Sequence, residues 1–354
     1  MEISAAFWRT KRVLVTGHSG FKGSWLTLWL RTLGAQAEGL SLAPATQPNL
    51  YQLAVATESA LDSWTDVRDR NAVARILTSF QPEVIFHLAA QSIVRASYDD
   101  PLATFATNVM GTANVLEGAR SVPGLRALVV VTSDKCYANE PGSQAFTESS
   151  ALGANDPYSG SKACAELTAA TWRRAFFDTA GIATARAGNV IGGGDWSADR
   201  LMTDLVHAAI HGQSLRLRNP NAVRPWQHVL DALSGYLVLA EKLCGDAKSY
   251  GQAWNFGPDT HSEQTVAQMV GAFSRLWDRP VRHEILSTPQ PHESATLRLD
   301  SDRARRQLGW RPQLSTDEAL AWTVEWYRGW HNDPRSARAR TLDQLARYRD
   351  RLGS

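Results

Sequence analysis

The sequence predicts an α/β protein built on a doubly wound parallel sheet with a smaller, discontinuous lobe toward the C-terminus. Short, continuous apolar runs recur along the first half of the chain, and amphipathic stretches of helical period separate them. Strands buried on both faces have such runs, and this burial is typical of a parallel sheet covered by helices. Strands that alternate with helices in this way are joined by right-handed crossovers.

Each element follows from its local pattern. The expected strands are Arg12–Thr16, Ala37–Leu42, Glu83–Ala89, Ala127–Thr132 and Ile182–Val190. The expected helices between them lie at about 21–33, 69–80, 102–120 and 158–180. The first helix should end at Gly34, because glycine readily adopts the left-handed conformation that follows a helix.

The regular alternation of predicted strands and helices ends after residue 190. Glycines 192–194 form a loop, a segment rich in Asn and Pro follows at 219–225, and helices are expected near 199–211, 229–244, 264–277 and 315–330. We therefore expect residues 1–190 to form the sheet domain, with a segment at about 225–260 returning to it. Residues 191–354 should mainly form the smaller lobe. The arginine-rich segment at about 335–352 predicts a solvated surface helix.

Composition excludes several classes of protein. The net charge of +2 gives no bulk attraction to nucleic acid, so an anionic ligand must be held by local groups. The three cysteines are odd in number and form no C-x-x-C pair, which predicts no disulfide scaffold and favours a reducing cytoplasm. We expect no signal peptide and no membrane span, because no apolar stretch approaches about 20 residues. No metal site is predicted.

A glycine-rich motif follows the first predicted strand. Gly17, Gly20 and Gly23 open the first helix, in the context that a dinucleotide-binding fingerprint requires. Gly17 would allow the tight turn, Gly20 the approach of a pyrophosphate, and Gly23 close packing of helix and sheet. Phe21 and Lys22 lie within the motif, at a helix N-terminus that favours anions. The motif predicts a Rossmann-like, NAD(P)-binding domain. The alternative is that the three glycines only allow a tight turn.

The second predicted strand ends without the acidic residue that binds the ribose of NAD, and Lys22 could meet a 2′-phosphate. NAD is therefore expected and NADP is not excluded. Asp66 and Val67 could flank the adenine, or Asp66 could cap the helix at 69–80. Leu88, Ala89 and Ala90, at the end of the predicted strand Glu83–Ala89, complete the expected cofactor site.

Tyr158 and Lys162 stand four residues apart at the start of a helix and therefore share one face. A free tyrosine loses its proton near pKa ~10. A neighbouring ammonium and the positive charge of a nicotinamide would lower that pKa, which would make Tyr158 a general base. Lys162 could also bind the ribose of the cofactor.

The predicted strand Ala127–Thr132 ends in Thr132 and is followed by Ser133, Asp134 and Lys135. Ligands bind at the carboxyl ends of such strands. Thr132 could bind a substrate hydroxyl, Asp134 could act as a general acid, and Lys135 could act as a general base. The alternative is a strand-end turn with an exposed ion pair. An acid–base pair beside a Tyr–Lys pair indicates chemistry beyond hydride transfer.

Substrate contacts are expected from the edges of the smaller lobe. Arg224 offers a bidentate guanidinium to a diphosphate. Trp196 and Trp226 could stack on a base or a sugar, or they could be core anchors in a chain with 13 tryptophans. The remaining candidates are Asn189, Arg200, His228 and Arg298, with the polar pair His292–Glu293 in a neighbouring loop.

Seven motifs in order over nearly the whole chain resemble the extended short-chain dehydrogenase/reductase family. They are TGHSGFKGSWL, TSDKCY, DPYSGSKACAEL, RAGNVIGGGDW, RPWQHV, NFGP and LGWRP. Within that family they are similar to the nucleotide-sugar 4,6-dehydratases. Lys135 after Asp134, GGGDW and RPWQHV favour the branch that uses CDP-glucose.

The resemblance implies tightly held NAD, CDP-glucose as substrate, and CDP-4-dehydro-6-deoxyglucose as product. Tyr158 would take the proton of the sugar 4-hydroxyl as C4 gives a hydride to NAD, with Thr132 orienting that oxygen. Lys135 would remove the C5 proton, Asp134 would protonate the leaving 6-hydroxyl, and the hydride would return to C6. Pairing through two helices would give a homodimer or homotetramer.

The sequence departs from the family pattern at residues 138–155, where an aromatic-rich loop ending in two glycines is expected. Three alternatives therefore stay open. The protein could be a nucleotide-sugar 4-epimerase, a dehydratase of another nucleotide sugar, or a non-catalytic protein that binds NAD and nucleotide sugars.

Overall fold

The computed structural model describes residues 2–56, 62–139, 144–153, 155–259, 264–286 and 296–353. Its centre is a seven-stranded sheet in which every neighbouring pair is parallel. The strands, in spatial order, are β3 (Asp62–Trp64), β2 (Gln36–Ser41), β1 (Arg12–Thr16), β4 (Val84–His87), β5 (Ala127–Val131), β6 (Gly181–Ala187) and β11 (Ala253–Phe256). The order reverses between β1 and β4, and ligands bind at such a switch point.

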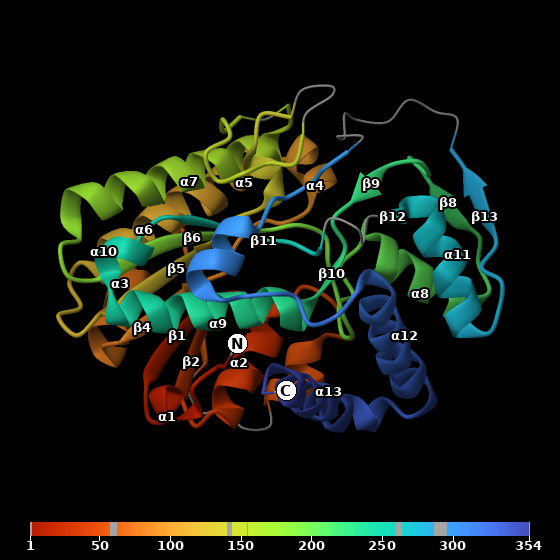
Figure 1. Ribbon diagram of the computed structural model, residues 1–354, viewed down its shortest axis with the longest axis horizontal. Helices are drawn as coiled ribbons and strands as arrows, with labels where there is room; N and C mark the ends of the chain where they lie inside the picture. Colours follow the sequence, from red (N-terminus) through yellow and green to blue (C-terminus); the bar gives the residue numbers. More distant parts are fainter. Residues whose placement is uncertain are drawn as a thin grey trace.

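Helices cover both faces of the sheet (Figure 1). On one face lie α3 (Arg70–Phe80), α6 (Gly111–Ala119) and α7 (Pro157–Phe176), and on the other α2 (Phe21–Thr32) and α9 (Val229–Gly245). Alternate side chains of β1 divide between the two cores, because Val13 and Val15 pack with α2 and α9 and Leu14 packs with α3 and α6. This confirms the predicted doubly wound α/β fold.

The smaller elements lie largely beyond one end of the sheet, at the right of Figure 1. They comprise α8 (Leu201–His211), β8 (Leu215–Leu217), β9 (Val223–Arg224), β12 (Gln264–Thr265), α11 (Val266–Trp277) and β13 (His283–Ile285). The remaining helices are α1 (Ala5–Trp8), η1 (Tyr51–Val55), α4 (Val94–Asp99), α5 (Pro101–Phe105), η3 (Ala106–Met110), η4 (Asp134–Cys136), α10 (Ala247–Tyr250), η6 (Ala304–Leu308), α12 (Thr316–Asn332), η7 (Pro334–Ser336) and α13 (Ala337–Leu352).

The strand predicted over Ile182–Val190 is wrong in extent. β6 ends at Ala187, and the next strand, β7 (Val190–Ile191), pairs with β10 (Gln227–His228) outside the main sheet. The chain leaves the sheet at Gly188, where a Cβ atom would lie 2.4 Å from Pro225 Cγ and 2.9 Å from Asp134 Oδ2. Glycine therefore lets these two residues approach the end of β6 closely.

The prediction of a solvated helix at 335–352 is wrong for one face of α13. This face buries residues at helical spacing, namely Ala337, Thr341, Gln344, Leu345, Tyr348 and Leu352. Gln344 Nε2 donates to the carbonyl of Trp322 at 2.8 Å, and Trp326 Nε1 donates to Thr341 Oγ1 at 3.0 Å. Small and polar residues carry much of this contact, so apolar periodicity gave little signal for it.

Tyr348 also ties α13 to a buried carboxyl on α9. Its hydroxyl donates to Asp231 Oδ1 at 2.7 Å, and the backbone N–H of Gln313 donates to the same oxygen at 2.6 Å. Burial raises the pKa of Asp231 from 3.8 to about 7. The protonated carboxyl of Asp231 therefore stabilises the folded protein fully at pH values below its unfolded-state pKa. This stabilisation is lost as the pH rises through about 7.

Replacing Asp231 by asparagine should remove this titration. The Tm of Asp231→Asn relative to the unmodified protein should rise between about pH 5 and about pH 8, because only the carboxyl must ionise in a dry site. Thermal unfolding at several pH values measures the difference, with the exposed Asp350→Asn as the matched control. A Tm difference that does not change with pH would contradict the assignment.

Candidate active site

A cleft of about 630 Å³ opens at the carboxyl ends of β1, β4 and β5. Its lining includes nearly all of the residues that the sequence predicts for the site. They are Gly17, Gly20, Phe21, Lys22, Gly23, Asp66, Val67, Leu88, Ala89, Ala90, Thr132, Asp134, Lys135, Tyr158, Lys162, Asn189, Trp196, Arg200, Arg224 and Trp226. Residues more than 200 positions apart in the sequence thus share one cavity.

The glycine motif forms the turn from β1 into α2. Gly17 has φ +73°, and a Cβ atom there would lie 2.7 Å from the backbone nitrogen of Ala89. A Cβ atom on Gly23 would lie 2.1 Å from the carbonyl oxygen of Gly17. Gly20 caps α2 without a side chain, so the first-turn N–H groups are left for an anion at the helix N-terminus. The motif therefore fits a dinucleotide pyrophosphate.

Asp66 and Val67 line the same end of the cleft. The alternative that Asp66 caps α3 is wrong, because the cap is Asp69, whose carboxylate accepts from the N–H of Ala72 at 2.9 Å. Asp66 instead accepts from Arg68 Nη2 at 2.6 Å, and this ion pair lowers the pKa of Asp66. Asp66 thus belongs to the cleft wall and not to the helix.

Lys22 does not lie where a 2′-phosphate would bind. That phosphate would sit near the end of β2, whereas Lys22 Nζ points toward α9 and lies 3.4 Å from the Tyr236 hydroxyl. Burial, followed by the positive charges of Arg200 and Lys162, lowers the pKa of Lys22 to about 7. Lys22 therefore belongs with the groups around Asp134, and the suggestion of a 2′-phosphate contact is corrected.

Tyr158 and Lys162 are placed by a well-formed helix start. Asp156 caps α7 by accepting from the N–H of Ser159 at 2.9 Å, and Pro157 occupies the first turn, which it suits because that position needs no N–H donor. Lys162 Nζ donates to the carbonyl of Val131 at 3.2 Å, and burial lowers the pKa of Lys162 to about 8. The helix thus holds both side chains against the end of β5.

The pKa of Tyr158 moves in the direction opposite to the prediction. Burial raises it to about 12 in the protein without ligands. The expected lowering depended on the positive charge of a cofactor as well as on an ammonium, and desolvation outweighs the protein's own charges. The tyrosine is therefore a neutral hydroxyl until a bound cation changes that balance.

The hydroxyl next to Tyr158 belongs to Ser133, and the role predicted for Thr132 is corrected accordingly. Thr132 Oγ1 donates to the buried carboxylate of Glu166 at 2.5 Å, which in turn pairs with Arg186 at 2.8 Å. Ser133 Oγ donates to Asp134 Oδ1 at 3.0 Å, and the Ser133 side chain also opposes the effect of burial on the pKa of Tyr158. Consecutive residues at the end of a strand point to opposite faces, so only one of the two hydroxyls reaches Tyr158.

Asp134 is the acidic group of this cluster. It is 3% exposed, and its Oδ2 has no hydrogen-bond partner within the described part of the chain. Burial raises the pKa of Asp134, while Lys135, Arg224 and Lys22 oppose that shift. A buried carboxyl with a raised pKa is suited to donating a proton. Lys135 follows it in η4, half-buried at the cleft wall.

The substrate side of the cleft carries several cations. Arg200 pairs with Asp195 at 2.9 Å and donates to Ser92 Oγ at 2.9 Å. Arg224 is buried beside Asp134. The cations that the sequence did not single out are Arg68, Arg95, Arg216 and Arg218. These four arginines pair with carboxylates of the protein, Arg68 with Asp66, Arg95 and Arg218 with Asp199, and Arg216 with Glu284, so much of their charge is compensated without a ligand.

Both tryptophans pack into the core and also line the cleft. Trp196 lines the cleft and also packs against Trp326, Tyr327 and Trp330 with ring centroids 5.1–5.9 Å apart. Trp226 is 3% exposed at the cleft, and its Nε1 donates to the carbonyl of Gln264 at 3.1 Å. Each is thus a core anchor with an edge in the cavity.

His228 and Arg298 are not among the residues that line the cleft. His228 is fully buried between Trp25 and Trp322, and its Nδ1 accepts from the N–H of Leu230 at 3.3 Å as the cap of α9. Arg298 is exposed. The geometry gives neither residue the predicted substrate contact, and His292–Glu293 lie outside the described residues.

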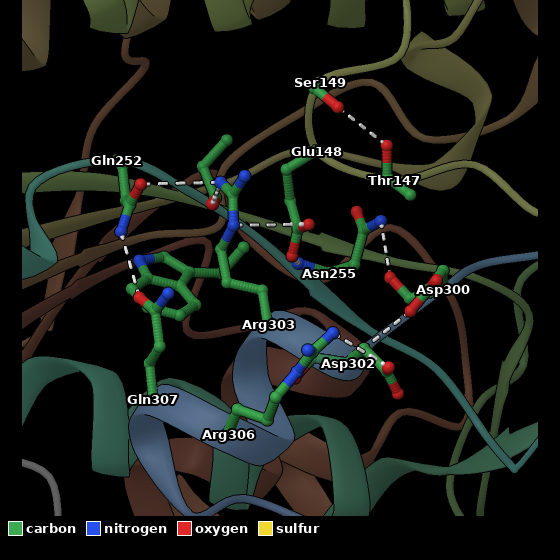
Figure 2. A network of polar contacts seen from close by, with 12 residues as sticks. Thr147, Glu148, Ser149, Gln252, Asn255, Asp300, Asp302, Arg303, Arg306 and Gln307 are labelled. Carbon is green, nitrogen blue, oxygen red and sulfur yellow. Dashed lines mark hydrogen bonds and ion pairs between the residues drawn. The ribbon is translucent and has the colours of Figure 1, made fainter.

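Residues 144–153 belong to the segment in which the sequence departs from the family pattern, and contacts with β11 and Arg303 hold them in place. Figure 2 shows Glu148 and Asn255 at the centre of this contact. Glu148 Oε1 accepts from the N–H of Asn255 at 2.9 Å, Oε2 pairs with Arg303 at 3.5 Å, and Asn255 Nδ2 donates to the carbonyl of Phe146 at 2.8 Å. The loop is thus held against β11 and the segment around Arg303.

The model of the protein family described as GDP-mannose 4,6 dehydratase matches residues 14–323. The chain belongs to this family. The CDP-glucose 4,6-dehydratase of Salmonella typhimurium is 42% identical over 335 residues, which are 93% of this chain and 93% of that protein. The UDP-glucose 4-epimerase of Mycolicibacterium smegmatis is 29% identical over 90% of this chain and 98% of its own length.

A solved structure agrees with this assignment to the GDP-mannose 4,6 dehydratase family. The dTDP-glucose 4,6-dehydratase of Streptomyces venezuelae, determined with NAD bound, superposes with a TM-score of 0.77 at 28% identity. The match covers 91% of this chain and 99% of that one. None of the helices in the described residues is long and apolar enough to cross a membrane.

Proposed function

We propose that this protein is a nucleotide-sugar 4,6-dehydratase that converts CDP-glucose to CDP-4-dehydro-6-deoxyglucose and water with NAD. The observation that carries the proposal is the placement of the Asp134–Lys135 pair beside Tyr158 and Lys162 in one cleft. A 4-epimerase needs the Tyr–Lys pair but no acid and base for C6 and C5. The 42% identity to a CDP-glucose 4,6-dehydratase supports the same choice.

The glycine turn and the N-terminus of α2 would hold the pyrophosphate of NAD, and Lys162 would bind its nicotinamide ribose. NAD, when bound, supplies the redox chemistry by taking a hydride from C4 of the sugar and returning it to C6. Tyr158 takes the proton of the 4-hydroxyl, and Lys162 and the cofactor charge favour its ionised form. The ketone at C4 then makes the C5 proton acidic.

Lys135 removes the C5 proton, and Asp134 donates a proton to the departing 6-hydroxyl. Buried Asp134 can hold that proton near neutral pH because desolvation raises its pKa. Arg224, which is buried beside Asp134, and Arg200 bind the diphosphate. Tyr158, Asp134 and Arg224 are each less than 9% exposed, and poor access of bulk water to these groups strengthens their electrostatic interactions.

Incubation with CDP-, dTDP-, GDP- and UDP-glucose tests the proposal. With NAD present, the CDP sugar should lose the mass of one water fastest, and the product should carry a ketone. Inversion at C4 without loss of water would instead indicate an epimerase. Binding of NAD and sugar without turnover of any member of the panel would indicate a non-catalytic protein.

Arg224→Ala should raise KM much more than it lowers kcat. The guanidinium binds the diphosphate alike in the ground state and the transition state, so its loss removes uniform binding. Steady-state kinetics with CDP-glucose measure the split, and Arg216→Ala, at an exposed position of the same cleft, gives a comparison. A normal KM in a folded Arg224→Ala protein would place the phosphate site elsewhere.

A homodimer or homotetramer and a cytoplasmic location belong to the same proposal. α5 and α7 are in contact with each other and with η3, and the three elements expose large apolar side chains, including Leu102, Met110 and Leu167. Exposed apolar patches of this kind support pairing with a second copy of the chain. Sedimentation of the protein and of Leu167→Glu would test it. The three free cysteines agree with a reducing compartment.

A further inference from the structure

One carboxylate in the cleft has no part in the proposed reaction. Within the described part of the chain, five acidic residues line the cleft. Four of them accept a hydrogen bond from an arginine or serine side chain, namely Asp66, Asp134, Asp195 and Asp199. The fifth is Asp204, which is half-buried, and none of the described residues forms a hydrogen bond or an ion pair with its carboxylate. Its acceptor atoms are therefore left for a ligand.

Asp204 lies on the side of the cleft that remains for the nucleoside. The sugar must reach the catalytic residues, and the diphosphate is assigned to Arg224 and Arg200, so the nucleoside lies beyond these two cations. Arg200 caps α8, and its carbonyl accepts from the N–H of Asp204 at 2.9 Å. Asp204 is thus one turn farther along a helix of the smaller lobe, about 6 Å along its axis. The order of the two residues along α8 matches the order of diphosphate and base in the substrate.

The wall beside Asp204 suits the flat ring of a base. β8 packs against α8, and the buried residues Leu215 and Leu217 of β8 line the cleft together with Met202 of α8. Ligand pockets are typically lined by apolar side chains with a few polar groups that fix the orientation of the ligand. In this part of the cleft the apolar side chains can cover the ring, and Asp204 can meet its polar edge.

We propose that Asp204 selects the cytosine base by accepting a hydrogen bond from its 4-amino group. An ionised carboxylate can only accept hydrogen bonds. Cytosine carries an amino group at C4, whereas uracil, like thymine, carries a carbonyl oxygen there, which is an acceptor. A uracil in the same position would bring two acceptors together and would bind more weakly. This inference rests on the proposed function, because it takes the substrate nucleotide to be CDP.

The electrostatic surroundings of Asp204 support this role. Burial, followed by the negative charge of Asp199, raises the pKa of Asp204 to about 6. The ionised carboxylate is therefore poorly stabilised by the protein alone. An amino group of the ligand would offset that cost, whereas a carbonyl oxygen would add to it.

The affinities for CDP and UDP test the proposal without any turnover. Isothermal titration calorimetry at pH 8, where Asp204 is ionised, gives the ratio of the two Kd values. In Asp204→Asn the preference for CDP over UDP should fall at least about fivefold, the lower end of what a well-placed base contact is worth. The amide can turn either its donor or its acceptor toward C4, so it no longer discriminates. Asp204→Ala offers neither group and should lower the preference as well.

The matched control is Asp199→Asn, which removes the same charge from a neighbouring carboxylate of the cleft. Because Asp199 is bonded to Arg218 at 2.7 Å, its loss should change both affinities alike and leave their ratio as it was. An acid near the start of α8 also stabilises that helix, and a role confined to this would lower the Tm of Asp204→Asn without changing the ratio. An unchanged ratio, or an equal fall in Asp199→Asn, would overturn the proposal.

Failure of this inference and failure of the proposed function give different results. A protein that dehydrates CDP-glucose and prefers CDP, with the same preference in Asp204→Asn, would overturn the role of Asp204 alone. Absence of water loss from CDP-glucose would overturn the proposed reaction, and the Kd ratio would still decide whether Asp204 selects the base. Equal binding of CDP and UDP by the unmodified protein would overturn the selection of cytosine.

Discussion

Tyr158→Phe should lower the rate of oxidation at C4 by about 10²–10⁴-fold, the usual cost of losing a general base. The ring remains in place on α7, so packing and cofactor binding should change little. The rate of the unmodified enzyme should rise with pH as Tyr158 loses its proton. Burial holds the pKa of the unliganded residue at about 12, and the positive charge of bound NAD should move this rise toward neutral pH.

Stopped-flow measurement of cofactor reduction checks both parts of this prediction. The matched control is Tyr250→Phe, since that ring stacks on Trp254 with centroids 6.1 Å apart, away from the cleft lining. The control should retain full activity. Near-normal reduction by Tyr158→Phe would exclude Tyr158 as the base.

The central sheet could be predicted from the sequence because its strands are buried on both faces. Arg12–Thr16 was predicted at its observed bounds, and the Ala127–Thr132 run differs from β5 by one residue. The spacing of the glycines also predicted the turn from β1 into α2, because a side chain at Gly17 or Gly23 would collide with nearby backbone atoms. Continuous apolar runs and steric needs are local properties, and a single sequence contains them.

The directions of individual side chains could not be predicted in the same way. The sequence TSDK offers two adjacent hydroxyls, and only the buried Glu166 beneath Thr132 decides that Ser133 is the one that meets Tyr158. Lys22 lies in the glycine motif, yet its side chain reaches toward Tyr236, more than 200 residues away in the sequence. These outcomes depend on long-range contacts that no local pattern encodes.

Asp134→Asn and Lys135→Met should separate the two halves of the reaction. Oxidation at C4 needs Tyr158 and the cofactor, whereas elimination needs a proton removed from C5 and another delivered to the C6 oxygen. Either variant should therefore oxidise the sugar and then stall. Reduced cofactor should accumulate, visible by its absorbance, while loss of water slows by roughly 10²-fold or more.

The two variants differ in one further measurement. Solvent deuterium should enter C5 of the product made by the unmodified enzyme and should enter far more slowly with Lys135→Met, which has no base for that carbon. Asp134→Asn keeps the base and should still exchange C5. The exposed Lys248→Met and Asp350→Asn are the matched controls and should behave like the unmodified enzyme. Normal water loss in both active-site variants would contradict the assignment. The acid and base would then have to come from elsewhere in the chain.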